Sequence, residues 1–123
     1  MHRVLTVFAA AILAAGTIAS APALAQPKVV VDGHMWLNST PETRKVFLIG
    51  AANGLALDSA YAKRTGTPAP VAGAMAAKAV EGMTLDQISD RITRWYEANP
   101  GRQSVPVMGV IWIDLVAPGA ARK

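Results

Sequence analysis

RWYEANPGRQSVPV, residues 94–107, is the stretch that decides how the end of this chain folds. Two adjacent aromatic residues, Trp95 and Tyr96, stand at the end of a segment with helical spacing, and Asn-Pro-Gly follows directly. Proline cannot continue a helix and disfavours helical geometry in the residue before it. The stretch therefore predicts a turn that folds the next segment back over both rings, with Pro106 fixing the direction of re-entry.

The segment before this turn, residues 83–98, has the clearest helical pattern in the chain. Thr84 and Gln87 have the spacing of a capping box, in which each side chain bonds the backbone N–H of the other residue. Asp90 and Arg94 lie four positions apart on the polar side, where an ion pair is expected. The apolar residues of the segment lie on the opposite side and form one stripe, which we expect to be buried. They are Leu85, Ile88, Ile92, Trp95 and Tyr96.

A longer helix is predicted over residues 41–63. Thr40 followed by proline is typical of a helix start, because proline needs no backbone donor in the first turn. A capping box formed by Ser39 and Glu42 is the alternative, with a boundary one residue earlier. Apolar residues on more than one side of this helix indicate a central position in the fold.

Two glycines, Gly50 and Gly54, lie four positions apart inside this long helix. A glycine within a helix costs about 1 kcal/mol relative to alanine. Each therefore needs a structural reason, and we expect another helix to approach closely there.

Two shorter elements flank the long helix. Asp32-Gly33 either turns the chain or caps a short helix that carries Trp36. Residues 65–70 contain a glycine and two prolines and predict a loop, and residues 71–81 predict a short alanine-rich helix ended by Gly82.

The last apolar segment, residues 105–116, is ambiguous from its own pattern. Its β-branched residues favour a strand, yet the spacing of its apolar residues also fits a helix with Pro106 near the first turn. It is too short to span a bilayer, so it is expected in the core. Pro118-Gly119 then closes the domain, and residues 119–123 form a tail.

The beginning of the chain is typical of an exported protein. A short positive start precedes an apolar run and an Ala-Leu-Ala ending, which predicts signal-peptide cleavage between Ala25 and Gln26. A retained membrane anchor is the alternative, but the run is short for a span of roughly 20 residues. We expect a domain over residues 26–118, located in the periplasm or secreted, with no stable membrane span after cleavage.

Composition excludes several classes of function. The chain has no cysteine, which excludes disulfides and thiolate metal sites, and its formal net charge is only +4. Its basic residues are scattered, so no nucleic-acid partner is expected. His34 is the one histidine after the predicted cleavage site and lacks a catalytic constellation. We therefore expect no enzymatic activity, no cofactor and no metal.

The residues left as candidates suit the binding of another protein. Tryptophan and arginine are enriched at interface hot spots. Trp36 fits an interface and the core equally well, whereas Trp95 and Trp112 are expected in the core. Arg91, Arg94 and Arg102 gather around one helix end and suit an acidic partner, although a solvated helix face gives the same pattern.

Two stretches together resemble the Rap/Tai-type immunity domain of exported bacterial proteins. These are GHMWLNSTPETRKVFLIGAANGLA from residue 33 and MTLDQISDRITRWYEANPGRQSVPVMGVIWIDLV from residue 83. The resemblance implies an all-α, single-domain bundle of four to five helices, in which the last segment is a helix. It also implies that Gly50 and Gly54 are helix-packing positions and that Tyr96 with Pro106 fixes the last crossing. The best-known members bind and block cell-wall amidases delivered by type VI secretion, and cysteines that this chain lacks staple their bundle.

Two functions are therefore expected from the sequence. The first is a periplasmic protein that binds and inhibits a cell-wall hydrolase or toxin, through Trp36 or through a patch around Arg91 and Arg102. The second is a structural or envelope-stress protein that self-associates through residues 71–80, in which case a homodimer is possible.

Overall fold

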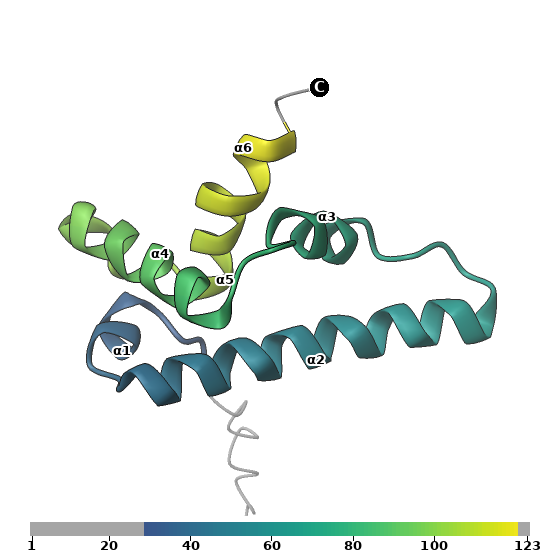
Figure 1. Cartoon of the computed structure of the whole chain (residues 1–123), viewed down its shortest axis with the longest axis horizontal. Coiled ribbons are helices and arrows are strands. Elements are labelled where there is room, and N and C mark those ends of the chain that lie inside the picture. Colours follow the sequence, from purple (N-terminus) through teal and green to yellow (C-terminus); the bar gives the residue numbers. More distant parts are fainter. Residues whose placement is uncertain (1–28, 121–123) are drawn as a thin grey trace, which may run out of the picture.

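The computed structural model describes residues 29–120, so the predicted cleavage site between Ala25 and Gln26 and residues 121–123 of the predicted tail lie outside the described part. Within residues 29–120 the chain is all-α, as predicted (Figure 1). The elements are α1 (Gly33–Leu37), α2 (Pro41–Thr65), α3 (Val71–Ala79), α4 (Leu85–Ala98), the 3₁₀ turn η1 (Pro100–Arg102), α5 (Val107–Val110), the π-helical η2 (Ile111–Val116) and α6 (Ala117–Ala120). The last three follow without a break and form one rod.

The elements are arranged around the long helix α2. Figure 1 shows α2 along one side of the molecule, with α4 and the rod over its first part, α3 over its middle and the connecting loop over its last turns. α4 packs on α1 and α2, and α3 packs on η2. The buried core cluster consists of Trp36, Leu48, Ile88, Ile92, Tyr96, Val107, Val110, Ile111, Leu115 and Val116. No helix within residues 29–120 is long and apolar enough to cross a membrane.

Local signals in the sequence place the starts of the two main helices. Thr40 caps α2 through its side chain, so the alternative box of Ser39 and Glu42 is not used. Both bonds of the box formed by Thr84 and Gln87 are present at the start of α4, at 2.9 and 3.1 Å. These caps satisfy backbone N–H groups that have no partner inside the helix.

The turn after α4 closes on the N-terminal segment through Tyr96. The Tyr96 side chain is fully buried, and its hydroxyl donates a 2.6 Å hydrogen bond to the carbonyl of Val105. The ring lies directly against Gly33, where an added Cβ would be 2.5 Å from the ring, so glycine is required. The Gly33 N–H donates to the carbonyl of Gln103 at 2.8 Å. The prediction that the turn folds the chain back over Tyr96 is confirmed.

The buried environment of Tyr96 also changes the acidity of its hydroxyl. Burial raises the pKa of the Tyr96 phenol to about 12, and the negative charge of Asp32 adds to the increase. The neutral phenol is therefore the form that the folded chain favours.

The last apolar segment is a helical rod, so its strand propensity is overridden by packing. The residues that face the core are Val107 and then two adjacent pairs, Val110 with Ile111 and Leu115 with Val116. The pairs begin five positions apart. A π-helix has a wider turn than an α-helix. Trp112 falls between the buried positions and is 45% exposed, so the prediction that Trp112 belongs to the core is wrong.

The expectation of a close helix contact at Gly50 and Gly54 is also wrong. Apart from the neighbouring residues and backbone of α2 itself, no described atom lies within 4 Å of the position that a Cβ would take at either glycine, and both residues are exposed. They lie on the side of α2 that faces away from the core. The two glycines thus lower the intrinsic stability of α2 without serving a contact between described residues.

Replacing Tyr96 by phenylalanine should destabilise the fold. Tyr96→Phe leaves the Val105 carbonyl without its partner in a part-buried position, and we expect the free energy of unfolding to fall by about 1–2 kcal/mol. Urea unfolding followed by circular dichroism measures this loss. Tyr61→Phe is the matched control, since Tyr61 is 65% exposed and the same change there should alter stability by less than about 0.5 kcal/mol. Equal effects of the two changes would contradict the role given to Tyr96.

Stability should also decline at alkaline pH because of Tyr96. The folded chain holds the phenolic proton more tightly than the unfolded chain, since the pKa is raised from 10.0 to about 12. This contribution is complete below pH 10 and is lost as the pH rises toward 12. Urea midpoints measured between pH 9 and about 12 should therefore fall more steeply for the native chain than for Tyr96→Phe. Parallel curves for the two proteins would refute this assignment.

Candidate partner-binding site

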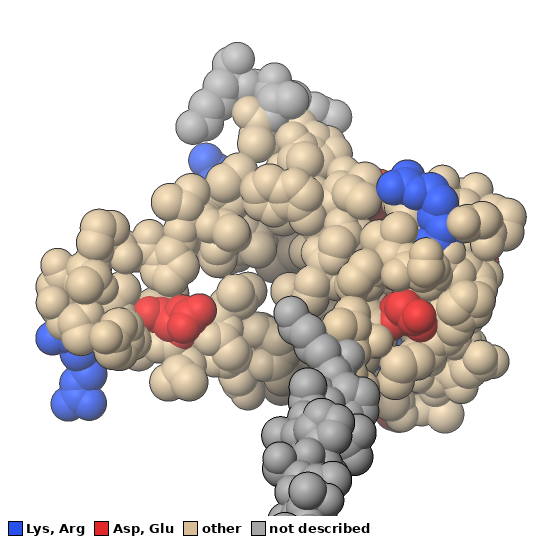
Figure 2. Space-filling view, turned by 180° about the vertical axis from the view of Figure 1, so that it is seen from behind, with Lys and Arg blue, Asp and Glu red and all other residues tan. Residues whose placement is uncertain are grey.

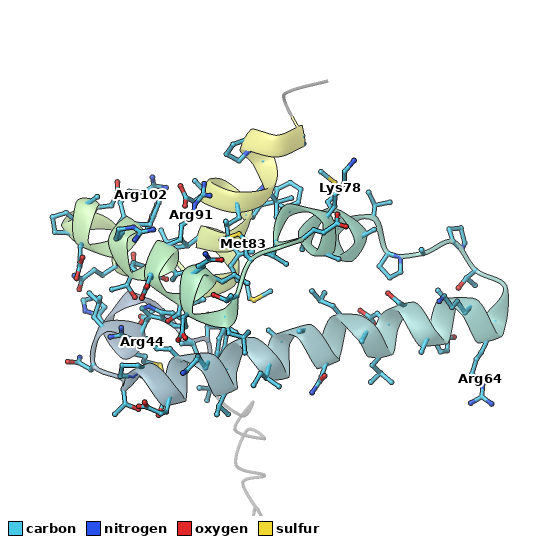
Figure 3. All side chains as sticks on the ribbon, in the orientation of Figure 1. Arg44, Arg64, Lys78, Met83, Arg91 and Arg102 are labelled. Carbon is cyan, nitrogen blue, oxygen red and sulfur yellow. The ribbon has the colours of Figure 1, made fainter. Side chains whose placement is uncertain are left out.

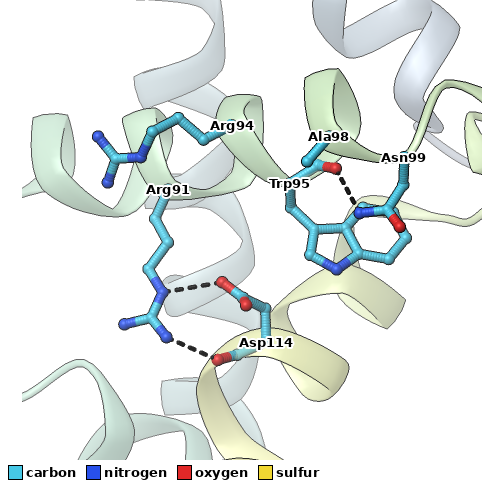
Figure 4. Close-up of a pocket in the computed structure, with 6 residues that line it drawn as sticks. All are labelled: Arg91, Arg94, Trp95, Ala98, Asn99 and Asp114. Atoms are coloured by element: carbon cyan, nitrogen blue, oxygen red, sulfur yellow. Dashed lines mark hydrogen bonds and ion pairs between the residues drawn. The ribbon is translucent and has the colours of Figure 1, made fainter.

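Three of the four predicted partner-binding residues lie together at the C-terminal end of α4. Arg91, Arg94 and Trp95 share one face of α4 because they are spaced three and four positions apart, and Arg102 comes from η1. A hollow of about 430 Å³ opens beside them (Figure 4). We call this region the arginine site; it consists of Arg91, Arg94, Trp95, Ala98, Asn99, Arg102 and Asp114.

Arg91 ties α4 to the rod. Its Nε donates to Oδ2 of Asp114 at 2.8 Å, and one of its terminal nitrogens donates to the Asp114 backbone carbonyl, also at 2.8 Å (Figure 4). The two bonds use the fork of the guanidinium, which fixes its plane. Arg91 therefore holds one wall of the hollow in place, and Asp114 offsets its charge.

Trp95 forms another wall and orients Arg102. The guanidinium of Arg102 lies over the Trp95 ring, 5.0 Å from its centre, in a cation–π contact. The other edge of Trp95 packs against Tyr96, with ring centres 5.4 Å apart, and Asn99 donates to the Trp95 carbonyl at 2.8 Å. Trp95 is therefore half-buried rather than a complete core residue.

Arg94 and Arg102 carry the positive charge that the site offers to solvent. Both residues are exposed, and within residues 29–120 the ion pairs are Lys45 with Asp86 and Arg91 with Asp114. The predicted pair between Asp90 and Arg94 is not formed. Two such guanidiniums beside an aromatic face suit a carboxylate, because the arginine fork matches the two carboxylate oxygens.

Trp36, the fourth candidate partner-binding residue, is a core residue, so of the two alternatives that the sequence left open the core one holds and the interface one is wrong. Its side chain is 1% exposed, its indole N–H donates to Oγ1 of Thr93 at 2.9 Å, and its ring packs edge-on against Phe47. Arg44 donates to the carbonyls of Trp36 and Leu37 and lies 5.7 Å from the centre of the Trp36 ring. Arg44 thus joins α1 to α2, and no motif in the sequence indicates this role.

A second hollow, missed from the sequence, lies between α2 and α3. We call this cavity of about 510 Å³ the α2–α3 groove, and Ser59 is the one residue with a polar side chain among those that line it. Small residues line it on both helices, and the helices are close at one point, where a Cβ added at Gly73 would lie 3.6 Å from the Leu55 side chain. Figure 2 shows this side of the molecule hollowed and covered mostly by uncharged residues. The alanine-rich pattern of both helices is the signal that could have indicated it.

His34 lies on α1, where it is exposed. Within residues 29–120, no three histidine, cysteine, aspartate or glutamate residues gather closely enough to hold a metal ion. Within residues 29–120, the arginine site is therefore where charged and aromatic side chains converge on a hollow.

Comparison with protein-family models, curated proteins and solved structures finds no match for this chain.

Proposed function

We propose that this chain is an exported protein-binding domain that inhibits a cell-wall hydrolase, as do the Rap/Tai-type immunity proteins that it resembles. The observation that carries the proposal is the arginine site, where the exposed guanidiniums of Arg94 and Arg102 flank Trp95 beside a hollow of about 430 Å³. The contact of Tyr96 with the segment around Pro106, which the resemblance also implies, supports it.

The site is suited to binding because much of it is already ordered. Asp114 fixes Arg91, and the Trp95 ring orients Arg102, so fewer side-chain rotations are lost when a partner arrives. Tryptophan and arginine are also the residues that most often dominate protein interfaces. The expected partner surface is an acidic segment with at least one carboxylate for Arg94 and one for Arg102.

The location of the site suits insertion into a cleft. Figure 1 places the end of α4 and the following turn at one extremity of the molecule, away from α3. Figure 3 shows Arg102 at this extremity and Lys78 on α3, far along the molecule. A protruding, positively charged end is a shape that can enter and block the substrate cleft of a hydrolase.

Charge reversal at the site tests the proposal. The binding of the purified chain to a panel of cell-wall hydrolases, and its inhibition of peptidoglycan cleavage by each, are measured together. We expect one hydrolase to be bound and inhibited, and Arg94→Glu with Arg102→Glu to weaken binding by about 100-fold or more. The double variant should keep the circular dichroism spectrum of the native chain, because both side chains are exposed.

Lys78→Glu is the control, since it makes the charge reversal of a single arginine change at an exposed position on α3. It should leave binding and inhibition within about twofold of the native values. Failure to inhibit any hydrolase of the panel, or inhibition that survives the double reversal, would overturn the proposal.

A further inference from the structure

The side of α2 that faces away from the core is largely apolar, and no other element within residues 29–120 covers it. Val46, Leu57 and Tyr61 are 67%, 71% and 65% exposed, whereas Leu48 and Ala62 on the opposite side are buried. Helical spacing places the exposed residues in one line along α2. We call this line the outer stripe; it consists of Val46, Ile49, Gly50, Asn53, Leu57 and Tyr61.

The outer stripe has little side-chain bulk around its middle. Gly50 belongs to it and Gly54 borders it, and no described atom outside the adjacent part of α2 lies within 4 Å of where their Cβ atoms would be. Glycine weakens a helix, but it lets the backbone of another helix approach closely. Asn53 lies between them, and a single polar residue in an apolar helix seam fixes the register of the pairing.

The charged residues at the two ends of the outer stripe indicate which helix packs on it. Glu42 and Arg64 lie on the same face of α2, each eleven positions from Asn53, so each is about 16 Å from it along the axis. Neither forms an ion pair with another described residue. A second copy of α2, antiparallel and related by a two-fold axis at Asn53, brings each Glu42 to the Arg64 of the other copy. A parallel copy would instead place like charges together.

The apolar residues match in the same arrangement. Ile49 of one copy meets Leu57 of the other, because both are four positions from Asn53 on opposite sides. The contact runs for about 33 Å along two helices and buries on the order of 600 Å² per copy, near the lower end of the usual range for specific interfaces. We propose that this chain forms an antiparallel homodimer through the outer stripe of α2, with Asn53 on the two-fold axis.

Charge exchange tests both the dimer and its direction. The dimer dissociation constant of the purified product of the full chain is measured by sedimentation. Arg64→Glu and Glu42→Arg should each raise it at least about tenfold, and the double variant should restore it to within about threefold. Lys63→Glu is the matched control, because Lys63 is the exposed neighbour of Arg64 but points about 100° away from the stripe. Thermal unfolding of each variant shows that the fold is kept.

The absence of cysteine allows a second test. Asn53→Cys places one thiol at the two-fold axis, so mild oxidation should link most of the protein into covalent dimers. Asp58→Cys, exposed on α2 but off the stripe, should yield few. A chain that stays monomeric at millimolar concentration, a dimer indifferent to Arg64→Glu, or equal cross-linking at both positions would overturn the proposal.

The dimer does not depend on the proposed inhibition, because the outer stripe and the arginine site share no residue. Arg64→Glu should weaken the dimer at least about tenfold and leave the binding of a monomeric hydrolase unchanged. Arg94→Glu with Arg102→Glu should weaken hydrolase binding and leave the dimer unchanged. If the native chain forms dimers but binds no hydrolase, the proposed function alone fails. If it binds a hydrolase but stays monomeric, this inference alone fails.

Discussion

The burial of Tyr96 joins segments that are distant in the sequence. Its ring occupies the space left by the missing side chain of Gly33, and its hydroxyl donates a hydrogen bond to the carbonyl of Val105. One side chain therefore fixes α1 against the end of α4 and sets where the rod begins. The arginine site depends on this arrangement, because the Trp95 ring packs on Tyr96 and the Arg102 guanidinium lies over the Trp95 ring. A polar tip satisfied by a turn carbonyl lets a large aromatic ring be buried without loss of its hydrogen bond.

The core is distributed unevenly along α2. After Leu48, Ala62 is the one residue of this helix that is buried, so the distal part carries little of the packing that normally stabilises a helix. The groove toward α3 and the outer stripe lie on opposite sides of this part. An exposed apolar side on a helix with two glycines is unfavourable for an isolated chain. It becomes favourable when a second helix covers it, which is the physical basis of the proposed dimer.

Local rules explain what could be predicted from the sequence. The cap at Thr84 and the proline turn after α4 act over a few residues, so the pattern alone placed the helix and its end. The burial of Trp36 could not be predicted, because it depends on Thr93, which lies far along the chain. The same limit applies to the site. The grouping of the arginines around α4 follows from spacing, whereas the pairing of Arg91 with Asp114 exists only after the rod folds back.

The two proposed surfaces are geometrically compatible. α4 packs on the core-facing side of α2, and the outer stripe lies on the other side, so pairing of two α2 helices leaves both arginine sites open. A two-fold dimer would then present two identical positively charged ends held at a fixed separation by rigid helices. Two such ends bind a dimeric or surface-attached hydrolase more tightly than one, since the second contact forms at a high effective concentration. A moderate interface at each arginine site would therefore suffice for strong inhibition, which fits the small hollow and the few side chains that form it.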